Sequence, residues 1–129
     1  MTLVDTSVLV QVEKKKLQAL ELVGELLAAG RLAVSAVTAH ELLRSPDLSD
    51  AWRDFWLDFL DAVEVVDLDL DAAVAAASLW RERRSRNRGV KLDVGDVLIA
   101  GTAAARAMDA VTDDDGFAEL AGARLVRPS

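Results

Sequence analysis

The sequence predicts an α/β fold in which α-helices flank a central parallel β-sheet, within a single domain spanning residues 1–129. Short runs rich in β-branched residues alternate with longer segments whose apolar residues recur at helical spacing. This alternation is typical of a parallel sheet with crossover helices. A chain of 129 residues is long enough for one hydrophobic core and leaves little room for a second.

The expected strands are short, over residues 2–5, 31–35, 63–66, 110–112 and 124–127. Helices are expected over residues 15–29, 50–62, 72–84 and 96–108. A further helix would carry Glu41, with Thr38 as its N-terminal cap and Pro46 at its end. The pair Thr6 and Ser7 is interpreted as a turn or a cap. In the first long helix, the apolar face is expected to consist of Leu17, Leu20, Leu22, Leu26 and Leu27.

The composition limits the kind of metal site that the chain can build. It has no cysteine and one histidine, His40, which excludes disulfides, thiolate zinc sites and centres built from several histidines. Any metal site must use oxygen ligands, which suit hard cations such as Mg²⁺ or Mn²⁺. The formal net charge of −7 by itself argues against a nucleic-acid partner, because phosphate binding usually needs a basic surface. Carboxylates that collect cations would partly resolve this conflict.

The N-terminal segment is apolar, but it lacks the basic region and the small-residue cleavage site of a signal peptide. No apolar run is as long as a helix that crosses a bilayer, since Asp or Glu interrupts each one. We therefore expect a cytoplasmic protein without a membrane partner.

The notable acidic residues stand where an expected strand ends or a helix begins. Asp5 closes the first strand, Glu41 lies early in the helix after the second strand, and Asp96 opens a later helix. The acidic run 113–115 follows the strand that ends at Thr112. Open α/β sheets bind ligands in the crevice outside the carboxyl ends of their strands, so these acids are expected to converge there.

Carboxylates gathered in this way repel one another and need cations among them. Divalent cations held by such acids activate a water and stabilise the charge on a phosphodiester during in-line attack. The acidic residues therefore predict metal-dependent cleavage of phosphodiesters, a reaction that requires no protein nucleophile.

Four segments in order along the chain, LVDTSVLV, SAVTAHELLR, DVLIAGTAAA and VTDDDGF, resemble the motifs of PIN-domain ribonucleases. The resemblance covers essentially the whole chain and is closest to the VapC toxins of bacterial toxin–antitoxin pairs. It implies a PIN-like fold and an endoribonuclease that cleaves RNA by metal-activated water, with Mg²⁺ or Mn²⁺ as cofactor. It also implies a homodimer and a small VapB-type antitoxin whose C-terminal tail wraps the toxin and blocks the site.

The resemblance implies one metal-binding and catalytic set, which is Asp5, Glu41, Asp96 and Asp114. Asp114 is selected because the family has an Asp or Asn two positions after a Thr, here Thr112, and an anchoring aromatic shortly after, here Phe117. Thr112, and Thr6 or Ser7, match positions where the family often has hydroxyls that can hydrogen-bond the acids.

Each acid also has a simpler interpretation. Asp5 and Asp96 are plausible helix caps, Glu41 can form an ion pair on a solvated face, and the run 113–115 can be a solvated turn. The joint occurrence of all four acids, in order and in position, favours a functional site. Three further acids stay open as members of that site, namely Asp93, Asp113 and Asp115.

Other functions remain open beside the toxin. A PIN nuclease in RNA processing, or one acting on structured DNA, would have no antitoxin, and a catalytically inactive PIN-like module would only bind. A phosphatase of the haloacid-dehalogenase type also begins with a strand followed by Asp. However, it normally has a second Asp two residues later, where this chain has Ser7, and no later lysine motif follows.

Two further patterns bear on partners. The basic segment RERRSRNRGVK precedes Asp96 and is interpreted as a contact for RNA phosphates, the alternative being a solvated helix end. Trp52, Phe55, Trp56 and Phe59 recur at helical spacing and are interpreted as mostly core. Part of this stripe is a candidate groove for the antitoxin or a dimer contact.

Overall fold

The structure is a computed structural model in which residues 1–86, 89 and 91–125 are described. Within these residues the strands form one parallel five-stranded sheet in the order β3-β2-β1-β4-β5. The strands are β1 Thr2–Val4, β2 Leu32–Ser35, β3 Glu64–Val66, β4 Asp109–Thr112 and β5 Arg124–Leu125. This architecture confirms the expected fold class.

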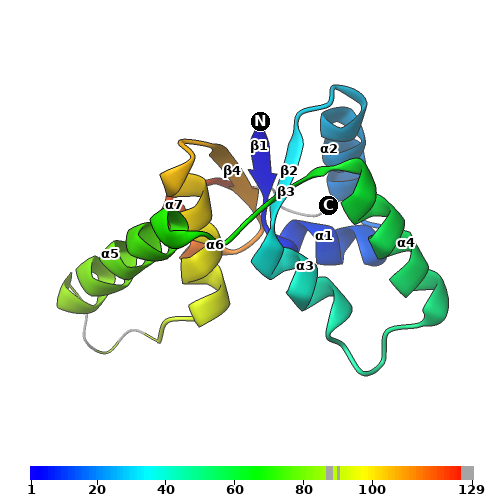
Figure 1. Cartoon of the computed structure of the whole chain (residues 1–129). Helices are drawn as coiled ribbons and strands as arrows, with labels where there is room; N and C mark the ends of the chain where they lie inside the picture. Colours follow the sequence, from blue (N-terminus) through cyan, green and yellow to red (C-terminus); the bar gives the residue numbers. More distant parts are fainter. Residues whose placement is uncertain (87–88, 90, 126–129) are drawn as a thin grey trace.

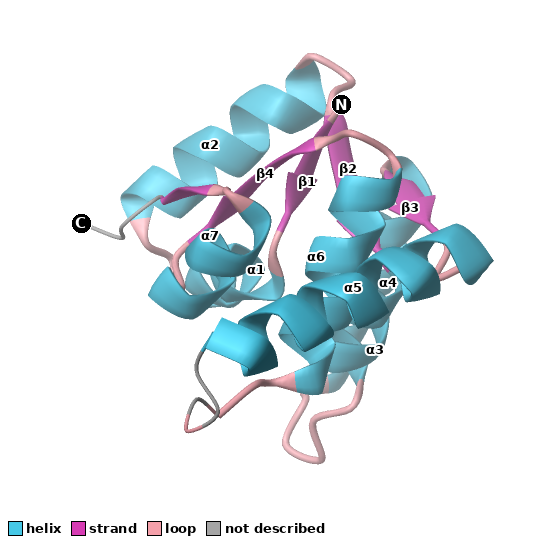
Figure 2. Ribbon diagram, turned by 90° about the vertical axis from the view of Figure 1, so that its left-hand side faces the viewer, coloured by secondary structure: helices cyan, strands magenta, loops and turns pink. Residues whose placement is uncertain are grey.

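Helices cover both faces of the sheet. They are α1 Thr6–Glu13, α2 Leu17–Ala28, α3 Ala36–Leu43, α4 Asp50–Ala62, α5 Leu70–Arg86, α6 Val94–Ala105 and α7 Asp115–Ala121. In Figure 1, α2 and α4 lie on one side of the sheet, and α5, α6 and α7 lie on the other. Figure 2 shows β4, β1 and β2 side by side, with α5 and α6 packed against each other in front of them.

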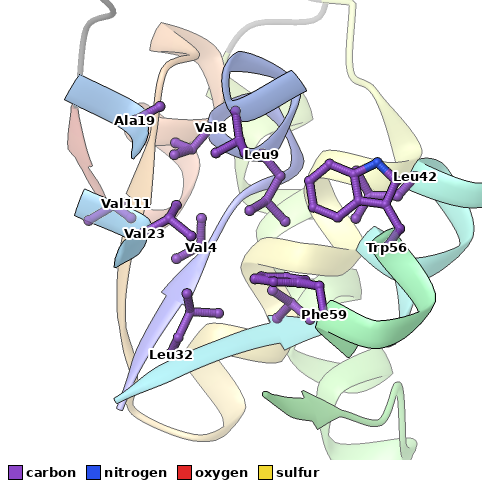
Figure 3. Packing of buried hydrophobic residues seen from close by; sticks show 12 residues of the cluster. Val4, Val8, Leu9, Ala19, Val23, Leu32, Leu42, Trp56, Phe59 and Val111 are labelled. Carbon is purple, nitrogen blue, oxygen red and sulfur yellow. The ribbon is translucent and has the colours of Figure 1, made fainter. Parts of the chain in front are cut away.

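The core consists of two hydrophobic clusters, one on each face of the sheet, because successive side chains of a strand point to opposite faces. In β1, Leu3 packs with Ile99 of α6 and Phe117 of α7, whereas Val4 belongs to the cluster of α1 to α4. Figure 3 shows this second cluster, in which the fully buried ring of Trp56 lies beside aliphatic side chains from several elements. Of the aromatic stripe of α4, which the sequence predicts to be mostly core, Trp56 and Phe59 are buried and Trp52 packs against them, whereas Phe55 is exposed.

Two helices of the structure are absent from the sequence prediction. Thr6 and Ser7 begin α1 instead of forming a turn, and Asp5 is the N-cap of that helix. The second is α7, which begins after the N-cap Asp114 and ends at Gly122, whose φ of 62° lies in the left-handed region. An acidic cap before each helix and a glycine after α7 are local signals that would have found both.

Two predicted helix starts are wrong. The helix α3 begins directly after Ser35, whose hydroxyl accepts the Val37 N–H, so Thr38 is not its cap but a fully buried residue inside it. The helix α6 begins after Asp93, whose carboxylate accepts the Asp96 N–H. Asp96 therefore lies in the first turn of α6 instead of opening it.

The predicted apolar face of α2 is also wrong in part. The buried residues of this helix are Ala19 and Val23. Three of the five leucines expected to supply that face are exposed over 60%, 41% and 42% of their surface, namely Leu17, Leu20 and Leu27. The small Ala19 and the compact Val23 allow a close approach to the core. As a result α2 presents apolar side chains outward.

Among the described residues, no helix is both long enough and apolar enough to cross a membrane. The end of the last expected strand, residues 126–127, lies outside the described part of the chain.

Candidate active site

The candidate site lies at the carboxyl edge of the sheet, between β1 and β4. The chain runs from β1 outward to β2 and β3, and then returns to place β4 on the other side of β1. The strand order therefore reverses between β1 and β4, which is the position where open parallel sheets form a ligand crevice. Asp5 follows β1 and Asp114 lies two residues beyond the end of β4, so both stand at this position.

Asp5 is the most constrained of the four acids, because only 2% of its surface is exposed. One carboxylate oxygen accepts the Thr6 N–H at 2.9 Å. The other accepts the hydroxyls of Ser7 at 2.8 Å and Thr112 at 2.7 Å. Burial raises the pKa of Asp5; these hydrogen bonds oppose the rise, and the charge of Glu41 adds to it. Asp5 is thus a helix cap and also part of the acidic group.

Glu41 reaches the site from the second turn of α3. Its Oε1 accepts the hydroxyl of Thr6 at 2.7 Å. Its Oε2 lies against the backbone of Gly95 in α6, since a Cβ built on that glycine would be only 2.6 Å away. The guanidinium of Arg44 stands 3.8 Å from Oε2 and is well exposed, so this ion pair is weak. Thr6 and Gly95 therefore fix the position of the Glu41 carboxylate.

Asp96 shows that the acids share one electrostatic environment. Burial, followed by the charges of Asp5, Asp93, Asp114 and Glu41, raises the pKa of Asp96 to about 7. These five carboxylates come from four segments that are far apart in the sequence, since Asp93 and Asp96 share the start of α6. The structure thus brings together all four sequence-predicted residues, and Asp93 stands beside them while capping α6.

The three consecutive acids after β4 have different surroundings. The Oδ1 of Asp114 accepts the N–H groups of Gly116 and Phe117, which caps α7, and its charge acts on Asp96. The carboxylate of Asp113 instead accepts from the side-chain amide of Gln11 at 3.3 Å. Asp115 is exposed in the first turn of α7. The geometry therefore favours Asp114 over its two neighbours.

Hydroxyl groups hold this edge of the sheet together. The Thr112 hydroxyl accepts the Asp114 N–H at 3.0 Å and donates to Asp5, while the Ser7 hydroxyl accepts the Asp113 N–H at 2.9 Å. The hydroxyls at the predicted positions therefore do bond the acids or the backbone beside them. They link the start of α1 to the end of β4, so the acids sit on a rigid frame.

Gly95 is a site residue that the sequence analysis missed. Its signal was a glycine in the first turn of an otherwise helix-favouring segment, directly before Asp96. An added Cβ there would meet Glu41 at 2.6 Å and the Asp93 Oδ1 at 3.1 Å.

The donor set of this site consists of oxygen atoms, as hard divalent cations prefer. Among the described residues, no three His, Asp or Glu side chains are placed so that they could hold one ion together as they stand. The negative charges around Asp96 nevertheless create the electrostatic condition that a bound cation relieves.

The basic segment is partly neutralised by its own surroundings. Arg83 of α5 forms an ion pair with Glu119 of α7, and Arg86 lies 3.7 Å from Glu82. Arg84 stacks over the ring of Trp80, 5.4 Å from its centroid. Arg88 lies outside the described residues. The predicted RNA contact of this segment stays a prediction.

Comparison with known proteins identifies the family of this chain. A family model described as PIN domain matches residues 2–123. The Ribonuclease VapC5 of Mycobacterium tuberculosis is 34% identical over 126 residues, which cover 95% of this chain and 89% of that protein. The chain belongs to the PIN domain family.

Solved structures of similar proteins include toxin–antitoxin complexes. The DNA-bound VapBC of Salmonella typhimurium matches with a TM-score of 0.74 at 25% identity, covering 98% of this chain and 96% of that one. The VapBC-5 complex of Mycobacterium tuberculosis matches with a TM-score of 0.59 at 27% identity, covering 98% and 97% respectively.

Proposed function

We propose that this chain is a metal-dependent endoribonuclease and the toxin of a VapBC-like type II toxin–antitoxin pair. The observation that carries the proposal is that Asp5, Glu41 and Asp114 lie near Asp96, where burial and their charges, with that of Asp93, raise the pKa of Asp96 to about 7. The similarity to a protein named as a ribonuclease supports RNA as the substrate. The toxin–antitoxin complexes among the structural relatives support an antitoxin as partner.

Asp5, Glu41, Asp96 and Asp114 would hold Mg²⁺ or Mn²⁺, because carboxylate oxygens suit these ions and the repulsion among the acids needs a positive charge. Since no three described His, Asp or Glu side chains are placed so that they could hold one ion together as they stand, ligation would be partly through water or would follow side-chain rotation. A bound cation would supply an activated water and stabilise negative charge on the phosphate.

Side chains of the protein itself hold the acidic residues in position. The hydroxyls of Ser7 and Thr112 hold the Asp5 carboxylate in one orientation, and the hydroxyl of Thr6 does the same for Glu41. Asp114 uses one carboxylate oxygen to cap α7, and its second oxygen would serve the cation. Such preorganisation matters because displacing a reacting group by about 1 Å can cost about a hundredfold in rate.

The test is cleavage of a defined RNA by antitoxin-free protein, with Mg²⁺ or Mn²⁺ against EDTA. We expect metal-dependent cutting by the wild type and none by Asp96→Asn. The matched control is Asp113→Asn, because this neighbouring acid is turned toward Gln11 and should keep most activity. If the wild type and Asp96→Asn behave alike on several structured RNAs, the chain is a binding module instead of a nuclease.

The antitoxin would bind at the apolar surface between α2 and α4. Leu20 and Leu27 of α2 and Phe55 of α4 are 41%, 42% and 45% exposed beside a pocket of about 170 Å³. Gly24 lines this pocket in the middle of α2, where nothing stands within 4 Å of a Cβ built on it. A glycine in the middle of a helix destabilises that helix. Because Gly24 has no side chain, an apolar partner helix would be able to approach α2 closely at this position.

Co-expression with the product of a neighbouring short reading frame tests this surface. Gly24→Gln should abolish co-purification of the two proteins, because the new side chain fills the pocket and adds a polar group. Leu68→Gln is the control, since Leu68 is similarly exposed, at 38%, but lies outside the pocket. If Gly24→Gln still co-purifies with its partner as the wild type does, the antitoxin binds at another surface. Lack of any such neighbouring frame would favour a PIN nuclease without an antitoxin.

Homodimerisation and a cytoplasmic location stay predictions, the first testable by light scattering and the second by cell fractionation.

A further inference from the structure

A second cavity lies beside the acidic site and has no part in the proposed cleavage chemistry. It has a volume of about 410 Å³, is open to the surface and is lined by residues of α1, α3, α4 and the α3–α4 connection. Glu41 forms part of its wall. Because the same carboxylate belongs to the acidic site, a ligand in this cavity would lie next to the reacting phosphate.

The apolar part of the wall includes a fixed aromatic ring. Trp52 lines the cavity and is half-buried. Its ring stacks against Trp56 at 5.8 Å between centroids and meets the edge of Phe55 at 5.1 Å. Val10 and Leu48 add aliphatic surface to the same cavity. A flat ring held on its other sides by two further rings is a suitable platform for stacking an unpaired nucleobase.

The polar part of the wall consists of acceptors and hydroxyls. Glu13 accepts the indole N–H of Trp56 with one oxygen, so its second oxygen remains an acceptor. The hydroxyl of Ser45 accepts the Asp47 N–H at 3.3 Å, and Ser49 accepts the Trp52 N–H at 3.1 Å. Each hydroxyl therefore still has a proton to donate.

These walls discriminate among ligands by charge. Glu13, Glu41 and Asp47 all line the cavity, and their negative charges repel a phosphate group. A neutral, flat ring with N–H donors satisfies both the carboxylates and the apolar surface. Adenine, cytosine and guanine carry an exocyclic amino group with two N–H donors, whereas uracil has O4 in place of an amino group and offers the single donor N3–H.

We propose that this cavity is a nucleobase subsite that receives the unpaired base of the nucleotide next to the scissile phosphate, with preference for amino-bearing bases over uracil. The proposal rests on the proposed ribonuclease activity. Trp52 supplies the stacking surface, and Glu13 accepts from the amino group. The subsite would make cleavage depend on the base that flanks the cut.

One test measures cleavage of single-stranded RNAs that differ only in the nucleotides flanking the cut. We expect the wild type to prefer amino-bearing bases over uracil by about tenfold or more, and Trp52→Leu to lose about tenfold in kcat/KM on the preferred RNA. Glu13→Gln keeps an acceptor for Trp56 but adds a competing donor, so it should reduce the base preference. Leu57→Ala, exposed on the same helix and outside the cavity, is the control.

A second test measures binding in EDTA, where no cleavage occurs. Short oligonucleotides of adenine or cytosine should quench tryptophan fluorescence more than oligouridine does, and Trp52→Phe should lose most of that difference. If no RNA is cut but the quenching is as expected, the ribonuclease proposal fails while the subsite stands. If RNA is cut but Trp52→Leu keeps both the wild-type rate and the base preference, the subsite is wrong. If Trp52→Leu keeps RNA cleavage and the base preference but no longer binds the antitoxin, the cavity serves a protein partner.

Discussion

At Gly95 the backbone of α6 lies close to the carboxylate of Glu41. A Cβ added there would be 2.6 Å from the Glu41 Oε2, far inside ordinary contact distance. Because the Thr6 hydroxyl also donates to Glu41 at 2.7 Å, the carboxylate would lose this hydrogen bond if it moved away from an added Cβ. Gly95 thus positions Glu41 by having no side chain.

We therefore expect Gly95→Ala to fold normally and to lose RNA cleavage by about 10- to 100-fold, because Glu41 is displaced. Cleavage assays combined with circular dichroism measure both effects. Ala104→Ser adds one atom at an exposed position of the same helix and should change neither. Full activity in Gly95→Ala would mean that the position of Glu41 is unimportant for the reaction.

The pKa of Asp96 makes the stability of the metal-free protein depend on pH. Its value of about 7 in the folded state lies above the ordinary value of 3.8, so the folded state binds the proton more tightly than the unfolded state. Stability should then fall as pH rises from about 4 to about 7, and the full cost is present above pH 7. After allowance for solvent screening, we expect this cost to be about 1–2 kcal/mol.

Asp96→Asn should remove that cost. We expect the variant to be more stable than the wild type at pH 8 and about equally stable near pH 4, as measured by urea unfolding in EDTA. A smaller pH dependence should remain, because burial also raises the pKa of Asp5. If the free energy of unfolding changes with pH in the same way in the two proteins, Asp96 is not the source of the pH dependence.

At the scale of elements, two glycines inside helices have opposite surroundings. Gly24 in α2 has open space around it, with nothing within 4 Å of an added Cβ. Gly101 in α6 packs against α5, where an added Cβ would be 2.6 Å from the Ala76 backbone nitrogen and 2.7 Å from the Ala72 carbonyl oxygen. The close pairing of α5 and α6 depends on this missing side chain.

The same substitution should therefore have opposite effects. Gly24→Ala is expected to stabilise the fold by about 0.5–1 kcal/mol through helix propensity. Gly101→Ala is expected to destabilise it by about 1–3 kcal/mol, since backbone atoms must move apart. Chemical denaturation of both variants measures the difference. An equal gain in both would mean that α5 and α6 separate without cost.

The elements that could be predicted from the sequence are those with long, regular patterns. The helix α4 lies at the expected residues 50–62, because its polar and apolar residues alternate strongly at helical spacing. The short helices α1 and α7 were not predicted, because eight and seven residues contain too few apolar positions to show a helical period. The buried face of α2 was misjudged because leucine is common on both of its sides.

For the whole molecule, the net charge of −7 and the acidic edge of the sheet predict a response to divalent cations. We expect millimolar Mg²⁺ or Mn²⁺ to raise the melting temperature at pH 8, because an ion that binds only the folded state stabilises it. The gain should shrink near pH 5, where Asp96 is largely protonated. Thermal melts with NaCl at equal ionic strength provide the control.

The variant Asp96→Asn should lose most of this cation-dependent gain, whereas Asp113→Asn should keep it. A gain of the same size in both variants and in the wild type would indicate general screening of the surface charge, and would contradict a specific site at the edge of the sheet.

The sequence by itself determined the fold class, the oxygen-only donor set and the order of the four acids, because these follow from local periodicity and from residue chemistry. It could not decide between a helix cap and a site residue, and the structure shows that Asp5 and Asp114 are both caps and neighbours of Asp96. Only the tertiary structure placed Glu41 against Gly95 and turned Asp113 toward Gln11. These contacts join residues far apart in the chain, and they depend on how the helices pack, which no local pattern encodes.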